Sequence, residues 1–192
     1  MKSLVAAVGL TLASTWAAAQ IGGDERPRFI LGMGLTGGGE TLARVTYTNG
    51  DSQNISSGGL VMFYGGVEAR IGTLVSLQVT AGYHVDDTNA SNGRVRFTRY
   101  PIDVLAFVPV TDKLRFGAGA QFVTNPRLRG SGVASGVDQQ YDSTVGFVLE
   151  GEYRFAPWFG LKLRGVSEKF KESNTGNSVS GNHGGLLASF YF

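Results

Sequence analysis

The last nine residues of the chain, Gly184 to Phe192, constrain its fold more than any other segment. At the two-residue period of a β-strand, Leu186, Ala188, Phe190 and Phe192 share one face. An apolar strand face has to be covered, either by other side chains or by lipid. The fold therefore depends on how many such strands the chain contains and on what covers them.

Seven further segments repeat this alternation. In one of them Phe147 and Leu149 alternate with Glu150, Glu152 and Arg154, so one face is apolar and the other is charged. A content of 29 Gly and only 5 Pro in 192 residues also favours strands and turns over a helix bundle. The eight expected strands are 29–36, 61–71, 75–84, 94–108, 113–123, 144–155, 159–168 and 184–192.

The connections alternate in length, which predicts an up-and-down antiparallel arrangement. Short turns are expected at 72–73, 109–112 and 156–158, and long polar loops at 37–58, 86–93, 124–142 and 171–182. In the first loop, Leu42 to Ile55 contains Asn49-Gly50, a strong hairpin signal, so we expect the first two strands to continue as a projecting hairpin. The alternation in 94–108 changes phase near Arg99 to Pro101, and this predicts a β-bulge there.

Alternation alone does not decide which face is inside, because a soluble barrel of the lipocalin type has the same period with its apolar face inward. Aromatic residues favour the inverted arrangement, since they gather near the strand ends, as expected for two interfacial girdles. These are Phe29, Phe155, Trp158, Phe159 and Phe192 at the turn side and Tyr83, Tyr100 and Phe122 at the loop side. The charged face is rich in Gly and mixes both signs, which suits a narrow lumen where charges neutralise each other. We expect this lumen network to consist of six cations, Arg70, Lys113, Arg115, Arg154, Lys162 and Arg164, and five carboxylates, Glu68, Asp103, Glu150, Glu152 and Glu168.

The first 19 residues have the pattern of a secretory signal peptide: Lys2, an apolar stretch from Leu4 to Leu12, and Ala17 to Ala19 before Gln20. We therefore expect residues 1–19 to be a signal peptide and residues 20–192 to form a single barrel domain. No stretch reaches the roughly 18 to 20 apolar residues of a spanning helix, which excludes an α-helical membrane protein. The chain has no Cys, and its 17 basic and 15 acidic residues give no reason to expect a nucleic-acid partner.

Taken together, these features predict an all-β, eight-stranded, antiparallel, up-and-down transmembrane β-barrel. The expected signal peptide, the eight segments, the three short turns and the terminal Ser189 to Phe192 resemble the small outer-membrane barrels of the OmpA and OmpX superfamily, often called porin-family proteins. The resemblance implies export to the bacterial outer membrane, contact with its lipid and lipopolysaccharide, and a monomer. It also implies that the barrel-assembly machinery reads Leu186, Ala188, Phe190 and Phe192 as its signal. Because the chain stops at the barrel, we do not expect a peptidoglycan-binding domain.

Function is less constrained than fold. The expected role is structural, in the cell envelope, or surface interaction through the loops, above all Leu42 to Ile55 and Gly130 to Asp138. The alternative is a narrow channel for small solutes, although a salt-bridged plug suits a lumen of eight strands better. A lipid-modifying enzyme based on His84 or His183 is a distant third, so we expect no catalytic site, cofactor or metal. Five arginines could meet lipopolysaccharide phosphates, or some of them could pair with Asp103 in the lumen: Arg94, Arg96, Arg99, Arg127 and Arg129.

Overall fold

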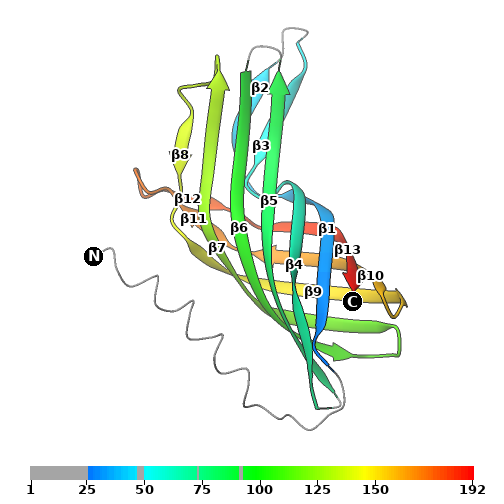
Figure 1. Cartoon of the computed structure of the whole chain (residues 1–192). Coiled ribbons are helices and arrows are strands. Elements are labelled where there is room, and N and C mark those ends of the chain that lie inside the picture. The colour runs from blue at the N-terminus through cyan, green and yellow to red at the C-terminus, as the bar shows by residue number, and fades with distance from the viewer. Residues whose placement is uncertain (1–25, 47–49, 73, 91–92) are drawn as a thin grey trace.

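The computed structural model describes residues 26–46, 50–72, 74–90 and 93–192, and the expected signal peptide lies outside them. Eight strands form a closed antiparallel barrel (Figure 1). They are β1 (Arg28–Gly38), β4 (Leu60–Ile71), β5 (Val75–Ala90), β6 (Gly93–Pro109), β7 (Leu114–Gly132), β9 (Thr144–Ala156), β10 (Phe159–Ser167) and β13 (His183–Tyr191). The eight-stranded fold expected from the sequence is thereby confirmed.

Each barrel strand pairs with the barrel strands before and after it in the chain, and the pairing of β1 with β13 closes the ring. The order is β6, β5, β4, β1, β13, β10, β9, β7, and β7 pairs again with β6. The terminal strand β13 lies between β10 and β1, with Ile30 opposite Tyr191. No helix among the described residues is long and apolar enough to cross a membrane.

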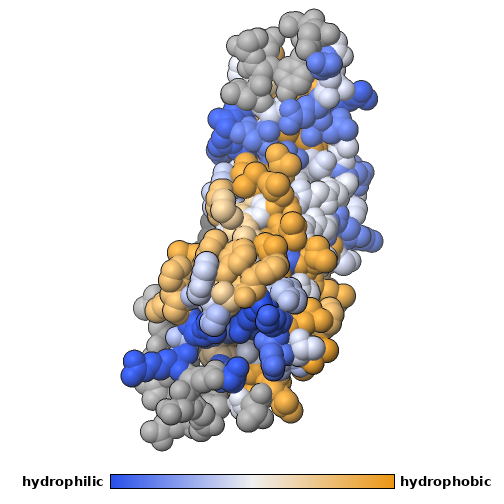
Figure 2. All heavy atoms as spheres, turned by 90° about the vertical axis from the view of Figure 1, so that its right-hand side faces the viewer, coloured by the Kyte–Doolittle hydropathy of each residue, from blue (hydrophilic) through white to orange (hydrophobic). Residues whose placement is uncertain are grey.

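The barrel has its apolar face outside and its polar face inside. Leu163 and Phe29 on the outer wall are 69% and 67% exposed, whereas Lys162 and Glu152 inside are fully buried. Figure 2 shows the outer hydrophobic side chains as a broad band between two hydrophilic areas. At the turn side the rings of Phe155, Trp158, Phe159 and Phe190 are in contact, with centroids 5.3 to 6.5 Å apart. This is the arrangement of a barrel surrounded by lipid, not of a soluble barrel.

Three strands continue well past the apolar band. In Figure 1, β5, β6 and β7 rise together as an upright sheet, and β8 (Asp138–Gln140) pairs with β7 at its edge. The predicted loops 86–93 and 124–142 are therefore wrong over much of their length, since β5 runs to Ala90, β6 starts at Gly93 and β7 runs to Gly132. These residues form strands because their inward apolar side chains are buried by the loops of the other strands. We call residues 85–90, 93–98 and 127–132 together with β8 the extracellular sheet, after the side on which the long loops of an outer-membrane barrel are expected.

The predicted bulge near Arg99 to Pro101 is also placed on the wrong strand. β6 keeps one parity throughout, with odd-numbered residues from Val95 to Phe107 buried. The surroundings of the strand change at Tyr100. On the turn side of Tyr100 the outward side chains are apolar, and on its loop side the inward side chains are apolar. The extra residue lies on the partner strand β7, where Thr98 opposes Arg127 but Tyr100 opposes Thr124. Asn125, in this bulge, has a φ of 49°.

Two hairpins fold beside the extracellular sheet. The hairpin predicted for the first loop is present as β2 (Thr41–Thr46) and β3 (Ser52–Ser56), but it forms a sheet of its own and does not extend the first two barrel strands. Asn49 of its expected turn lies outside the described residues. The second hairpin pairs β11 (Lys169–Lys171) with β12 (Ser178–Ser180).

The hairpins and the sheet enclose an apolar core over the loop-side end of the lumen. In this core the ring of Phe97 lies edge-on to Tyr141, with centroids 5.8 Å apart, and 6.0 Å from Phe170. We call it the apolar plug, and it consists of Ile55, Val95, Phe97, Val123, Leu128, Tyr141, Phe170 and Val179. The molecule thus has a hydrophobic core beyond the apolar band, and within the band the barrel interior combines buried charged residues with two smaller apolar clusters.

Candidate functional site

The ion pairs of the lumen form three layers, which share the interior with two small apolar clusters, and the lowest layer lies at the turn side. Arg115 is held between Glu68 and Glu152, with its Nη1 and its Nε each 2.6 Å from a carboxylate oxygen. Arg115 Nη2 donates to the Tyr191 hydroxyl at 2.9 Å, and that hydroxyl donates to Glu152 at 2.6 Å. Arg154 adds a second cation, 2.8 Å from Glu68. Each carboxylate of this layer therefore contacts at least one guanidinium.

The middle layer is organised in the same way. Arg164 contacts Glu150 at 2.6 Å and Asp103 at 2.9 Å. Lys162 Nζ lies 3.0 Å from Glu150 and donates to Gln78 at 3.0 Å. Both cationic partners, Lys162 and Arg164, come from consecutive inward positions of β10, and Arg164 opposes Glu150 directly across β10 and β9.

The upper layer lies directly beneath the apolar plug and contains both histidines. Arg99 Nη1 is 2.5 Å from Glu168, and its Nε donates to His84 Nδ1 at 3.0 Å. Because His84 Nδ1 accepts this hydrogen bond, its Nε2 carries the proton and donates to Thr36 Oγ1 at 2.7 Å. The ring of His183 lies 5.4 Å from that of His84. His84 therefore does not have the tautomer of a base that would activate Thr36.

The lumen network differs from its prediction at the rim. Nine of the eleven predicted residues lie inside: Glu68, Asp103, Arg115, Glu150, Glu152, Arg154, Lys162, Arg164 and Glu168. Arg70 and Lys113 are instead exposed at the turn side, because β4 ends at Ile71 and Lys113 lies in the turn before β7. Arg99, which the sequence grouped with Arg94 and Arg96, joins the lumen as the fifth internal cation. Its odd position on β6, shared with Asp103, is the signal that separates it from the two other arginines.

The ion pairs of the lumen join five cations to five carboxylates. The cations are Arg99, Arg115, Arg154, Lys162 and Arg164, and the carboxylates are Glu68, Asp103, Glu150, Glu152 and Glu168. Withdrawing such groups from water is costly unless they are paired and hydrogen-bonded. The balance explains how a strongly charged interior is compatible with a folded barrel. Among the described residues, no group of three or more His, Asp or Glu is placed to hold a metal ion.

A second charged area lies on the outer wall, just beyond the apolar band. Arg94, Arg96 and Arg129 line a cavity of about 370 Å³ together with Tyr83 and Tyr100. The two tyrosine rings are 5.6 Å apart, at the level where the outer wall changes from apolar to polar. We call Arg94, Arg96 and Arg129 the arginine patch.

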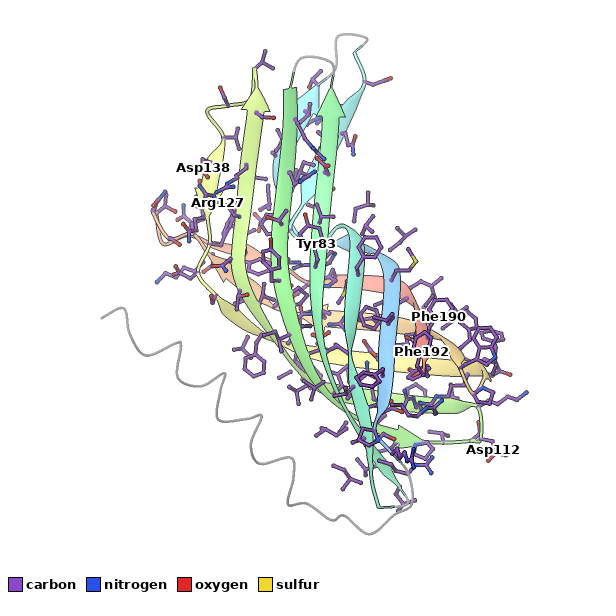
Figure 3. All side chains as sticks on the ribbon, viewed as in Figure 1. Tyr83, Asp112, Arg127, Asp138, Phe190 and Phe192 are labelled. Carbon is purple, nitrogen blue, oxygen red and sulfur yellow. The ribbon has the colours of Figure 1, made fainter. Side chains whose placement is uncertain are left out.

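Two acidic residues partly neutralise this side of the molecule. Asp87 pairs with Arg94 and, at 3.2 Å, with Arg96. Arg127 pairs with Asp138 at 2.7 Å, and this hydrogen-bonded guanidinium lowers the pKa of the Asp138 carboxyl. Figure 3 shows Arg127 and Asp138 together on the extracellular sheet, far from Phe190 and Phe192 at the other end of the barrel. Arg129 has no carboxylate partner of its own among the ion pairs of the described residues.

Comparison with known proteins identifies the fold but no sequence relative. The sequence matches no protein-family model, and no curated protein matches it. Among solved structures, the attachment invasion locus protein Ail of Yersinia pestis, in complex with the heparin analogue sucrose octasulfate, aligns with a TM-score of 0.53. The Neisserial surface protein A aligns with a TM-score of 0.50. Both are 11% identical to this chain, and each alignment covers 86% of this chain and 97% of the other. The chain therefore has the fold of small eight-stranded outer-membrane barrels.

Proposed function

We propose that the protein is a monomeric barrel of the bacterial outer membrane that acts as a surface-interaction protein, without enzymatic activity. The observation that carries this proposal is the extracellular sheet, which rises beyond the apolar band and has a buried core of its own. A rigid sheet with ordered hairpins presents side chains at fixed positions, which favours recognition because little ordering is required on binding. The paired charges of the lumen and the apolar plug favour this role over that of a narrow channel.

The chemistry of the extracellular side points to anionic ligands. The arginine patch lies on the outer wall next to Tyr83 and Tyr100, a position that corresponds to the headgroup level of the outer leaflet. Guanidinium groups bind phosphate and sulfate oxygens by charge-assisted hydrogen bonds. We infer that outer-membrane lipid is the first partner, through the phosphates of lipopolysaccharide. The sulfated sugar bound by Ail has the same charge sign, which makes a polyanionic saccharide the second ligand class to examine.

The outer face of β13 supports an assembly role for the end of the chain. Leu186 and Phe192 are 52% and 71% exposed, and Ala188 and Phe190 share their face. An apolar strand face that remains accessible on the finished barrel is also accessible to a partner during insertion. We propose that the barrel-assembly machinery recognises Leu186, Ala188, Phe190 and Phe192.

The function is tested with the mature protein in nanodiscs of phosphatidylcholine. Binding of intact and of dephosphorylated lipopolysaccharide is measured by microscale thermophoresis. Replacing Arg94, Arg96 and Arg129 by Gln is expected to weaken binding of the intact form about tenfold or more, because each lost charge-assisted contact contributes about 1.5–3 kcal/mol. Lys169→Gln, on β11 and outside the proposed contact surfaces, is the control. Equal affinity for both forms, or an equal loss in the control, would contradict the role of the arginine patch.

A second measurement separates surface interaction from transport. The segment Leu42 to Ile55 is replaced by a short Gly-Ser linker. Cells with the intact protein and cells with the replaced segment are then compared for binding of external ligands to the cell surface and for uptake of small dyes. The proposal predicts altered surface binding. In planar bilayers the intact barrel should show no stable current steps, and steps that change on Arg115→Gln would instead establish a narrow channel.

A further inference from the structure

The end of the lumen opposite the extracellular sheet opens into a cavity that the proposed function does not use. Its volume is about 460 Å³, and it lies at the short-turn side of the barrel. We call it the turn-side mouth; its lining consists of Arg70, the turn residues Pro109 to Leu114, Arg115 and Arg154. Figure 3 places Asp112, one of these turn residues, at the far end of the molecule from Arg127 and Asp138.

Positive charge exceeds negative charge in this lining. Four cationic side chains, Arg70, Lys113, Arg115 and Arg154, face the single carboxylate of Asp112. Glu68 and Glu152 lie deeper and are already engaged by Arg115 and Arg154. Adding these two carboxylates gives four cations against three anions among the described residues around the mouth. Within the described part of the chain, Lys113 Nζ has no carboxylate in ion-pair contact.

The inner wall of the mouth also holds an unused donor. Arg154 Nη2 donates to Glu68, but its buried Nε has no hydrogen-bond partner and lies 3.8 Å from Glu152 Oε1. Arg154 is kept in place by its backbone, whose N–H donates to the carbonyl of Lys113 at 2.8 Å, and by the ring of Tyr191, 4.8 Å from its guanidinium carbon. The position of the guanidinium is therefore fixed before any ligand binds.

We propose that the turn-side mouth is a binding site for a phosphate group, with Arg70, Lys113 and Arg154 as its ligands. Two guanidinium groups and an ammonium group supply the planar donors and the point charge that phosphate recognition uses. The cavity is large enough for a small phosphorylated molecule and is open at the barrel end. In a barrel oriented with its short turns inward, the site faces the periplasm, where the phosphate belongs either to a soluble solute or to a phospholipid headgroup.

The test uses pyrophosphate as the probe, with the mature barrel in dodecyl maltoside and a phosphate-free buffer. Isothermal titration calorimetry is expected to show saturable binding. Lys113→Gln and Arg70→Gln should each weaken it about tenfold, the effect of losing one charge-assisted contact. Lys169→Gln and Arg44→Gln remove the same charges at the loop side and should leave the affinity unchanged. Folding of every variant is verified by the gel mobility of unheated samples.

Two outcomes would overturn the proposal: no saturable binding by the intact barrel, or equal losses in the mouth variants and the controls. Nanodiscs distinguish the two sources of phosphate. If phosphatidylglycerol nanodiscs weaken pyrophosphate binding relative to phosphatidylcholine nanodiscs, and the double variant Arg70→Gln/Lys113→Gln abolishes that difference, the headgroup occupies the mouth. Equal binding in both lipids indicates a soluble ligand. The turn-side mouth and the arginine patch lie at opposite ends of the barrel. A lack of pyrophosphate binding at the mouth would therefore not contradict the lipopolysaccharide binding proposed for the arginine patch.

Discussion

Arg99 and Glu168 are 69 residues apart in the sequence, yet their Nη1 and Oε1 atoms lie 2.5 Å apart inside the barrel, and both side chains are almost completely buried. Breaking such a pair leaves one charge without a partner. We expect Arg99→Met to lower the free energy of unfolding by about 3–5 kcal/mol. The double variant Arg99→Met/Glu168→Gln should recover more than half of this loss, as measured by urea unfolding in phosphatidylcholine vesicles. Equal stabilities of the single and double variants would show that the pair is not coupled.

The apolar plug should be separable from the barrel beneath it. Phe170→Ala removes a fully buried ring, and a core Phe→Ala change costs about 3–5 kcal/mol. We expect faster hydrogen exchange in β11, β12 and the β2–β3 hairpin, with exchange in the barrel strands unchanged. Val133→Ala, at a site that is 76% exposed, is the control and should leave all exchange rates as they are. Faster exchange throughout the barrel would mean that plug and barrel unfold as one unit.

The inverted polarity of the wall predicts how it responds to charge. Leu163→Arg places a cation on the lipid face of β10 and should cost about 2–4 kcal/mol at the middle of the bilayer. Val133→Arg, beyond the apolar band, should cost less than about 0.5 kcal/mol, as is usual for exposed surface positions. Urea unfolding in vesicles measures both. A soluble barrel would tolerate the two changes equally.

Alkaline pH should loosen the extracellular side first. Burial, together with the carboxylates of Glu172 and Glu40, raises the pKa of the Tyr141 phenol from 10.0 to about 12. Between these values the folded protein keeps the phenolic proton and the unfolded protein loses it, so stability falls as the pH rises. Wild-type protein should therefore lose more thermal stability between pH 10 and 12 than Tyr141→Phe, measured by near-ultraviolet circular dichroism. Equal losses of thermal stability in the wild-type protein and in Tyr141→Phe would show that groups other than Tyr141 cause the effect.

The sequence predicts the barrel because membrane strands repeat one simple pattern. Cross-strand pairs such as Arg164 opposite Glu150 follow from inward parity and register alone. The expected lumen positions of Arg70 and Lys113 are wrong because parity does not show where a strand leaves the lumen. Both side chains line the turn-side mouth, a cavity that the sequence does not predict.

The extracellular sheet is harder to predict because its strands pass from lipid into water, and their inward residues change from polar to apolar at that point. The prediction places Asp87 in a loop because it is polar, although it is an outward residue of β5. In this region β5 pairs with β6, whose inward residues include Val95 and Phe97. The contacts that bury Phe97 come from Tyr141 and Phe170, which lie far away in the sequence. Local periodicity contains no information about such contacts.

The reversal of polarity along β6 has a consequence for how the protein sits in its bilayer. Tyr100 points outward at the last apolar level, and Phe97 points inward only three residues before it. A strand rises about 3.3 Å per residue, so displacing the reversal by two positions would shift the preferred immersion depth by roughly 6–7 Å along the strand. The height of the arginines above the hydrocarbon boundary is therefore encoded in a few neighbouring side chains, and it can be tuned independently of the barrel that supports them.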